Sequence, residues 1–173
     1  MAPPFPATPQ NLNHDGGPMN LTMFLVNYLG TALVAGVLGG LAMEGAMWLI
    51  ARAGLARGDM ILALGSLLTK SRDNAYRVGL VVHATAAIGF ALVYALLMVT
   101  LGYTRMPLSL MLGLGVGVLH GLLVSLMLVW VVADRHPLEE FKEADLLVGL
   151  SHFAGHVAYG GVVGLVVGLS PGL

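Results

Sequence analysis

The chain contains four apolar runs, each long enough to cross a lipid bilayer. They cover residues 21–51, 78–103, 107–133 and 146–169. A helix needs about 20 apolar residues to span the hydrocarbon core, and in lipid its backbone polar groups must be satisfied within the segment. A hydrophobic content of 57% with 10% charged residues also excludes an ordinary soluble domain. The sequence therefore predicts an all-α, polytopic membrane protein, with a four-transmembrane-helix bundle over residues 21–173.

The connections between these runs differ in charge. Seven of the eight Lys and Arg residues fall in the first and third connections, Arg105 alone lies in the second, and the segments before the first run and after the fourth carry none. Cytoplasmic loops are enriched in Lys and Arg, so we expect the first and third connections to be cytoplasmic and both termini to lie outside.

The segments outside the runs have their own patterns. Residues 1–20 are rich in Pro, Asn and Gly and have no apolar period, which predicts a disordered tail, with Met19 as a second plausible translation start. In the first connection, "DMILALGSLL" follows the N-cap residue Asp59 and predicts an amphipathic helix along the inner membrane surface. Its apolar face comprises Met60, Ile61, Leu64, Leu67 and Leu68. In the third connection, "HPLEEFKEADLL" predicts a short helix with a solvated acidic face.

Composition excludes several kinds of function. The net charge of −1 and the confinement of basic residues to loops argue against nucleic-acid binding. Because the chain has no Cys, it has no disulfides, thiolate iron–sulfur ligands, c-type haem attachment or Cys nucleophile. The ten Met residues show no repeated spacing and are interpreted as core filling. A metal site would therefore be built from His, Glu or Asp.

Glycines recur at a spacing of four residues and mark the sides of the helices that face other helices. They are Gly36 and Gly40 in the first run, Gly113, Gly117 and Gly121 in the third, and Gly160, Gly164 and Gly168 in the fourth. Five polar residues continue glycine stripes at spacings of three or four: Glu44, His83, His120, His152 and His156. Side chains at these spacings share a helix face, so all five should point into the bundle.

The depths of these groups predict one polar cluster. At about 1.5 Å per residue, four of them lie roughly 9 to 16 Å from the nearest charged loop residue. These four are Glu44, His83, His152 and His156. His120 is expected deeper, adjacent to the cluster. Tyr94 and Tyr159 follow the same helix faces and could donate hydrogen bonds.

Four interpretations of this cluster remain open. Glu44, His83, His152 and His156 have suitable ligand types for a transition metal, Zn, Fe, Mn or Cu. Alternatively, histidines from two helices, among His83, His156 and His120, could ligate a b-type haem. The same residues could form the proton or ion relay of a small transporter or channel. Finally, the protein could be a structural subunit without a cofactor, whose polar groups only hold the bundle together.

Among these interpretations, a binding or accessory protein is favoured over an enzyme. No Asp, Asn, Ser or Lys constellation converges on the cluster, and H-E-x-x-H is absent, so no catalytic residue is assigned. The expected partners are the lipid bilayer and either a second copy of the chain or a larger membrane complex.

Residues 20–169 resemble small uncharacterised bacterial families of four-helix integral membrane proteins. The shared pattern is four spans, the "DMILALGSLL" loop, a single His early in the second span, and "H-x-x-Y-G" in the last, here His156, Tyr159 and Gly160. The resemblance implies a multi-pass protein of the bacterial inner membrane and no known activity.

The distribution of basic residues generates a topology prediction. A reporter fused after Leu173 should be active on the periplasmic side, because the first and third connections retain seven of the eight basic residues in the cytoplasm. Paired alkaline phosphatase and fluorescent-protein fusions measure this. A fusion at Leu173 that is active only in the cytoplasm would reverse the orientation.

Overall fold

A computed structural model describes residues 20–55, 59–143 and 145–173 of the chain. Over these residues the structure is helical and contains no strand. The elements are α1 (Leu21–Arg52), α2 (Met60–Thr69), α3 (Ala75–Leu101), α4 (Leu108–Met127), a π-helical turn (Leu128–Val132), a 3-10 turn (Glu139–Phe141) and α5 (Leu146–Leu169). Helices α1, α3, α4 with its π turn, and α5 are each long and apolar enough to cross a membrane. The expected all-α bundle is confirmed, whereas the prediction of a disordered tail falls, apart from Asn20, outside the described residues.

Local sequence signals explain where the helices begin and end. The side chains of Asn20, Asp59 and Asp145 each accept a hydrogen bond of 2.8 to 2.9 Å from the backbone N–H three residues later. These N-caps satisfy donors that the first turn of a helix leaves free. Helix α3 ends at Gly102, whose φ of 72° is the left-handed conformation that glycine adopts without strain.

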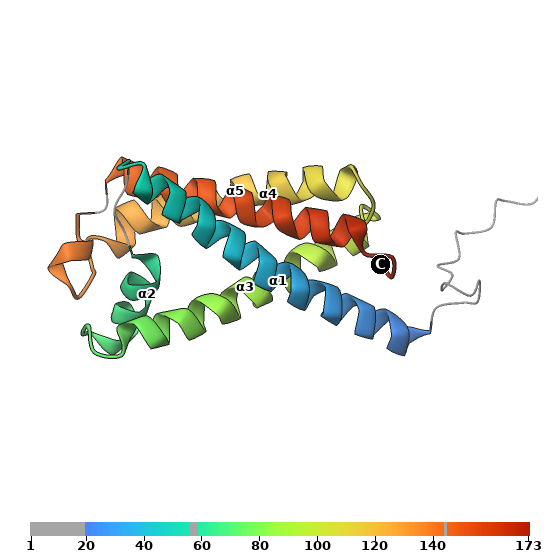
Figure 1. The fold of residues 1–173 in the computed structure, drawn as a ribbon, viewed down its shortest axis with the longest axis horizontal. Coiled ribbons are helices and arrows are strands. Elements are labelled where there is room, and N and C mark those ends of the chain that lie inside the picture. Colours follow the sequence, from blue (N-terminus) through green and yellow to red (C-terminus); the bar gives the residue numbers. More distant parts are fainter. Residues whose placement is uncertain (1–19, 56–58, 144) are drawn as a thin grey trace, which may run out of the picture.

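The four long helices form a bundle in which some helix pairs pack closely and others make few contacts (Figure 1). Helix α5 packs against α1 and α4, while α3 packs against α1 and α2 and has few contacts with α4. The beginning of α1 and the C-terminus lie at one end of the bundle, and α2 lies at the other. We call the latter the α2 end; it also holds residues 133–143, in the connection between α4 and α5.

Glycines bring α4 and α5 into backbone contact. A Cβ atom on Gly113 would overlap the carbonyl oxygen of Gly160, and a Cβ on Gly160 would overlap that of Gly113. A Cβ on Gly117 would come within 2.8 Å of the carbonyl oxygen of His156. The glycine stripes of these two helices are therefore packing faces, as the spacing predicts.

Helix α2 is fixed to α3 by another glycine pair. A Cβ on Gly65 would overlap the backbone of Ala75, and a Cβ on Gly79 would overlap the backbone of Ile61. The apolar face predicted for α2 is divided: Ile61 is buried and Met60, Leu64 and Leu67 line a cavity, whereas Leu68 is 60% exposed. The backbone contact, which has no signature in the apolar period, turns most of this face inward.

The connection before α5 has less helix than expected. Only Glu139–Phe141 form a 3-10 turn. Its acidic run is partly solvated. Glu139 pairs with Lys142 at 2.7 Å, and Glu140 pairs with Arg72 at 3.4 Å. The Arg72 pair ties this connection to the segment between α2 and α3.

The α4–α5 contact generates a stability prediction with a matched control on one helix. Gly117→Leu should destabilise the protein by roughly 1–3 kcal/mol or more, because the new side chain separates two backbones in contact. Gly115→Leu should be neutral or slightly stabilising, since no atom lies within 4 Å of its Cβ position. Thermal unfolding in detergent measures both. Equal loss of stability in the two variants would contradict this packing.

Candidate functional site

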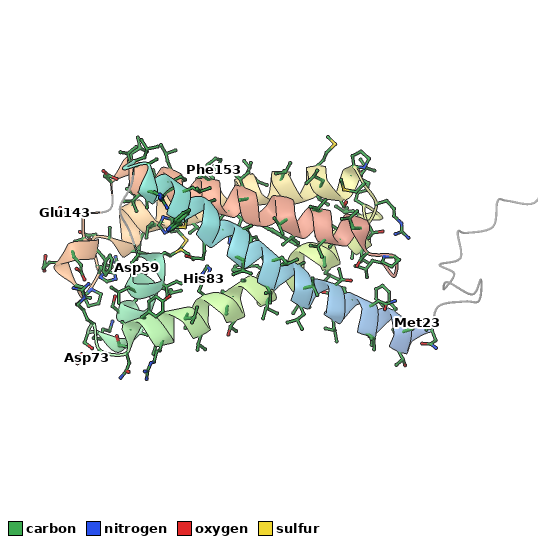
Figure 2. The ribbon with its side chains drawn as sticks, in the orientation of Figure 1. Met23, Asp59, Asp73, His83, Glu143 and Phe153 are labelled. Atoms are coloured by element: carbon green, nitrogen blue, oxygen red, sulfur yellow. The ribbon has the colours of Figure 1, made fainter. Side chains whose placement is uncertain are left out.

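A cavity of about 340 Å³ lies inside the α2 end of the bundle. Its walls come from α3, α4 and α5, and α2 and the connection before α5 cover it. Most of its lining is apolar, but five of the six histidines of the chain contribute to it: His83, His120, His136, His152 and His156. Figure 2 shows His83 in the space between α3 and the neighbouring helices, with Asp59 and Glu143 at the α2 end.

The cavity exists because α3 and α4 pack on different helices. Glycines hold α4 against α5, as described above. Helix α3 is instead held against α1, where a Cβ on Gly36 would come within 2.7 Å of the Cα of Ile88. Since α3 and α4 make few contacts with each other, the space between them at the α2 end is lined by side chains and not closed by backbone packing.

Glu44 on α1 and His83 on α3 face each other. Their Oε1 and Nε2 atoms lie 3.2 Å apart, which meets the distance of an ion pair. The two atoms are nevertheless out of line for a hydrogen bond, and among the described residues they are the buried side-chain nitrogen and oxygen atoms that have no hydrogen-bond partner. Leaving such buried groups unpaired is costly, all the more so in lipid.

His152 and His156 on α5 are buried and share one orientation. Each donates its Nδ1–H to the carbonyl oxygen four residues earlier, of Val148 and His152 respectively, at 2.8 Å. A carbonyl can only accept, so the proton of each neutral ring is on Nδ1 and the lone pair is on Nε2. This leaves Nε2 of both rings available as an acceptor or metal ligand.

His120 lies closer to the other histidines than its sequence depth suggests. Its ring centroid is 4.6 Å from that of His156 and 4.3 Å from that of Phe90, and its Nδ1 shares a hydrogen bond of 3.1 Å with the Tyr94 hydroxyl. The cause is the close approach of the two helices: a Cβ on Gly121 would come within 3.0 Å of the Cβ of His156. His120 thus lines the cavity with the others.

Tyrosines and an apolar cluster close the cavity on the side away from α2. Tyr94 is buried, and the Tyr159 hydroxyl donates to the Ala87 carbonyl at 2.5 Å. Both tyrosines hydrogen-bond within the bundle, as their positions predicted. Beyond them the described core is apolar, consisting of Ala32, Ala95, Met98 and Val167.

His136 was not identified from the sequence. It is 2% exposed, and its Nε2–H donates to the Ala63 carbonyl on α2 at 3.1 Å, while Nδ1 accepts from the Leu138 N–H at 3.1 Å. Nε2 therefore attaches the connection before α5 to α2, and Nδ1 fixes the backbone within that connection. A histidine in a charged loop usually lies in solvent, and only the following Pro137 hints at fixed structure here.

The charged residues that line the cavity are all acidic. They are Asp59, Glu140 and Glu143, at the α2 end. Among the described residues, no Lys or Arg lines it. The cavity therefore favours cationic over anionic occupants.

The residues predicted from the sequence are thus brought together, but not as a finished metal site. His83, His120, His152 and His156 line one cavity, and Glu44 adjoins it through His83. Within the described part of the chain, no group of three or more His, Asp or Glu residues is placed to hold a metal ion. The metal and haem interpretations remain predictions.

Comparison with known proteins gives no match: no family model, no curated protein and no solved structure is significantly similar to this chain. The class that fold and composition define is a multi-pass, all-α membrane protein. The outline resemblance to bacterial four-helix families stays a prediction.

The hydrogen bonds of His136 generate a prediction that separates it from the other histidines. His136→Ala should lower the free energy of unfolding by about 1–3 kcal/mol, because the Ala63 carbonyl and the Leu138 N–H lose their partner. Glu139→Gln, at an exposed side chain of the same turn, is the control and should change it by less than about 0.5 kcal/mol. Denaturant titration in micelles measures both, and an unchanged His136→Ala protein would contradict the attaching role.

Proposed function

We propose that the protein is an intramembrane binding protein for a transition-metal ion, with Glu44 Oε1 and His83 Nε2 as the first two ligands. The observation that carries this proposal is the pair itself. Two buried atoms, both suitable metal ligands, lie 3.2 Å apart without a hydrogen bond between them. The pair joins α1 to α3, and His83 opens into a cavity that holds further imidazoles.

The separation of the pair fits two ligands of one ion. Nitrogen and oxygen ligands bind Zn²⁺ at about 2.0–2.2 Å in a tetrahedral arrangement, so neighbouring ligand atoms lie roughly 3.3 Å apart. Their lone pairs then converge on the ion and not on each other. The donor atoms of two ligands of one ion are therefore expected to lie as close as those of an ion pair, but not to be aligned for a hydrogen bond with each other. Glu44 and His83 have this arrangement.

His156 and His152 are the residues proposed to complete the site. Their Nδ1–H groups are held by backbone carbonyls, an arrangement that fixes the tautomer and the ring orientation of metal-bound histidines. Since the described residues do not present three ligands together, metal binding requires the Glu44 and His83 side chains to move toward Nε2 of His156 or His152, whose rings keep their backbone hydrogen bonds. Water supplies any remaining position.

The chemistry of the proposed ligands limits which metal ions the site can bind. A set of imidazole nitrogens and one carboxylate, without thiolate, suits Zn, Fe, Mn or Cu(II). A b-type haem held by His83, His120 or His156 is the alternative occupant. Its two propionates would face the carboxylates of the cavity, so the charges favour a bare cation.

The surroundings of the site support binding over conduction. The four buried residues of the apolar cluster beyond Tyr94 and Tyr159 carry no titratable group, and Tyr28, which packs against them, donates its hydroxyl to the Leu92 carbonyl. The basic first and third connections support an inner-membrane topology with both termini outside and the α2 end in the cytoplasm. Trp48 and Trp130, 56% and 72% exposed, suit the membrane interface at that end.

The proposal predicts a stoichiometric metal. Full-length protein, purified in mild detergent and equilibrated with Zn²⁺, should retain about one ion per chain. Glu44→Gln and His83→Gln should each weaken retention by more than about 100-fold, since loss of even an outer-shell partner costs about 10- to 100-fold. Glu139→Gln, an exposed carboxylate outside the cavity, is the matched control. Elemental analysis after dialysis measures the metal content.

Other outcomes contradict the proposal. A parent protein that carries no metal, and that binds none when Zn, Fe, Mn or Cu is supplied, would show that the Glu44–His83 pair is only a contact between helices. A Soret band in the purified protein would show that haem is the occupant. Equal retention by the parent and by Glu44→Gln would place any metal elsewhere.

A further inference from the structure

The cavity is far larger than a metal ion requires, and we propose that it binds an amphipathic cation. The apolar body of this molecule lies between α3 and α4, and its positive charge lies near the carboxylates at the α2 end. This proposal rests on the size, lining and charge of the cavity. It is independent of the Glu44–His83 pair.

Volume is the first argument. The cavity measures about 340 Å³, which falls in the range of roughly 300–1,000 Å³ typical of small-molecule sites. A single ion with a few waters would fill only part of it, since a water occupies about 30 Å³ of liquid. The remaining lining is hydrocarbon, contributed by residues such as Leu64, Phe90, Val124 and Leu128. Water has few partners there, so an apolar group is the better occupant.

The cavity also opens toward the lipid-facing side of the bundle. Phe90 on α3 and Met127 on α4 both line it, and they are 44% and 58% exposed. These two helices make few contacts with each other. A molecule dissolved in the bilayer could therefore enter between α3 and α4 without first crossing a polar surface.

The charge of the cavity lining decides whether a cationic or an anionic ligand is favoured. Asp59, Glu140 and Glu143 line the α2 end of the cavity. Arg72 pairs with Glu140 at 3.4 Å, and among the described residues that line the cavity Asp59 and Glu143 then carry the remaining, negative charge. Phe141, an aromatic residue that packs against the His136 ring, lies in the lining with them. A fatty acid or another anionic amphiphile would meet repulsion at the same place.

Two probes of nearly equal size and opposite charge test the proposal. Tetraphenylphosphonium and tetraphenylborate are each equilibrated by dialysis with the full-length protein in micelles, and binding to protein-free micelles is subtracted. We expect saturable binding of about one tetraphenylphosphonium per chain and at least about tenfold weaker binding of tetraphenylborate. Equal or tighter binding of the anion, or binding that does not saturate, would overturn the proposal.

Variants locate the binding. Val124→Trp fills the cavity and should abolish binding of the cation, whereas Leu123→Trp, at a neighbouring position that is 63% exposed, should leave it unchanged. Ala63→Phe fills the cavity from α2 and serves if Val124→Trp does not fold. Retained binding in a folded cavity-filling variant would overturn the proposal.

Charge variants separate this site from the proposed metal site. Asp59→Asn combined with Glu143→Gln should weaken tetraphenylphosphonium binding about tenfold and reduce the preference over the anion, while Asn still caps α2. Glu44→Gln should lose the metal and keep the organic cation. An unchanged preference in the double variant would show that the carboxylates do not select the ligand. Failure of metal binding alone would leave this inference standing.

Discussion

The backbone contact between α4 and α5 fixes the geometry on which the site depends. Gly113 and Gly117 on α4 meet Gly160 and the His156 carbonyl on α5 with no side chain between them. This contact brings the His120 and His156 rings to a centroid separation of 4.6 Å. It also commits the small-residue faces of both helices to each other, so that α3 packs elsewhere, against α1 and α2. The cavity is the consequence of that division.

Lipid makes the polar interior a strong constraint. Histidines and a carboxylate in a bilayer are tolerated only where they face protein, water or one another. Most of the polar groups at the α2 end meet this requirement: His152 and His156 donate to carbonyls of their own helix, His120 contacts Tyr94, and His136 bridges to α2. Glu44 and His83 are the exception. Their unpaired atoms are the reason for proposing this pair as the first two ligands, with the histidines of α5 completing the site.

The features of each single helix could be predicted from the sequence, whereas the contacts between helices could not. The four apolar runs and the N-cap Asp59 predict the helices within a few residues, and glycine spacing predicts which faces are buried. A depth counted in residues along one helix takes no account of how far that helix is shifted past its neighbour. For this reason His120 was expected further from the cluster. The inward turn of the apolar face of α2 depends on Gly65 meeting the α3 backbone. His136 is structured through the distant Ala63 carbonyl, which no local pattern encodes.

The most direct test of the central claim, that Glu44 and an imidazole share one ion, is X-ray absorption spectroscopy of full-length protein loaded with one equivalent of Zn²⁺. The proposed site predicts a first shell of about four nitrogen and oxygen atoms at roughly 2.0–2.2 Å, with outer-shell scattering from at least two imidazole rings. Glu44→Gln should alter the first shell. A shell of oxygen atoms alone, without imidazole scattering, would contradict the assignment of the ion to this site.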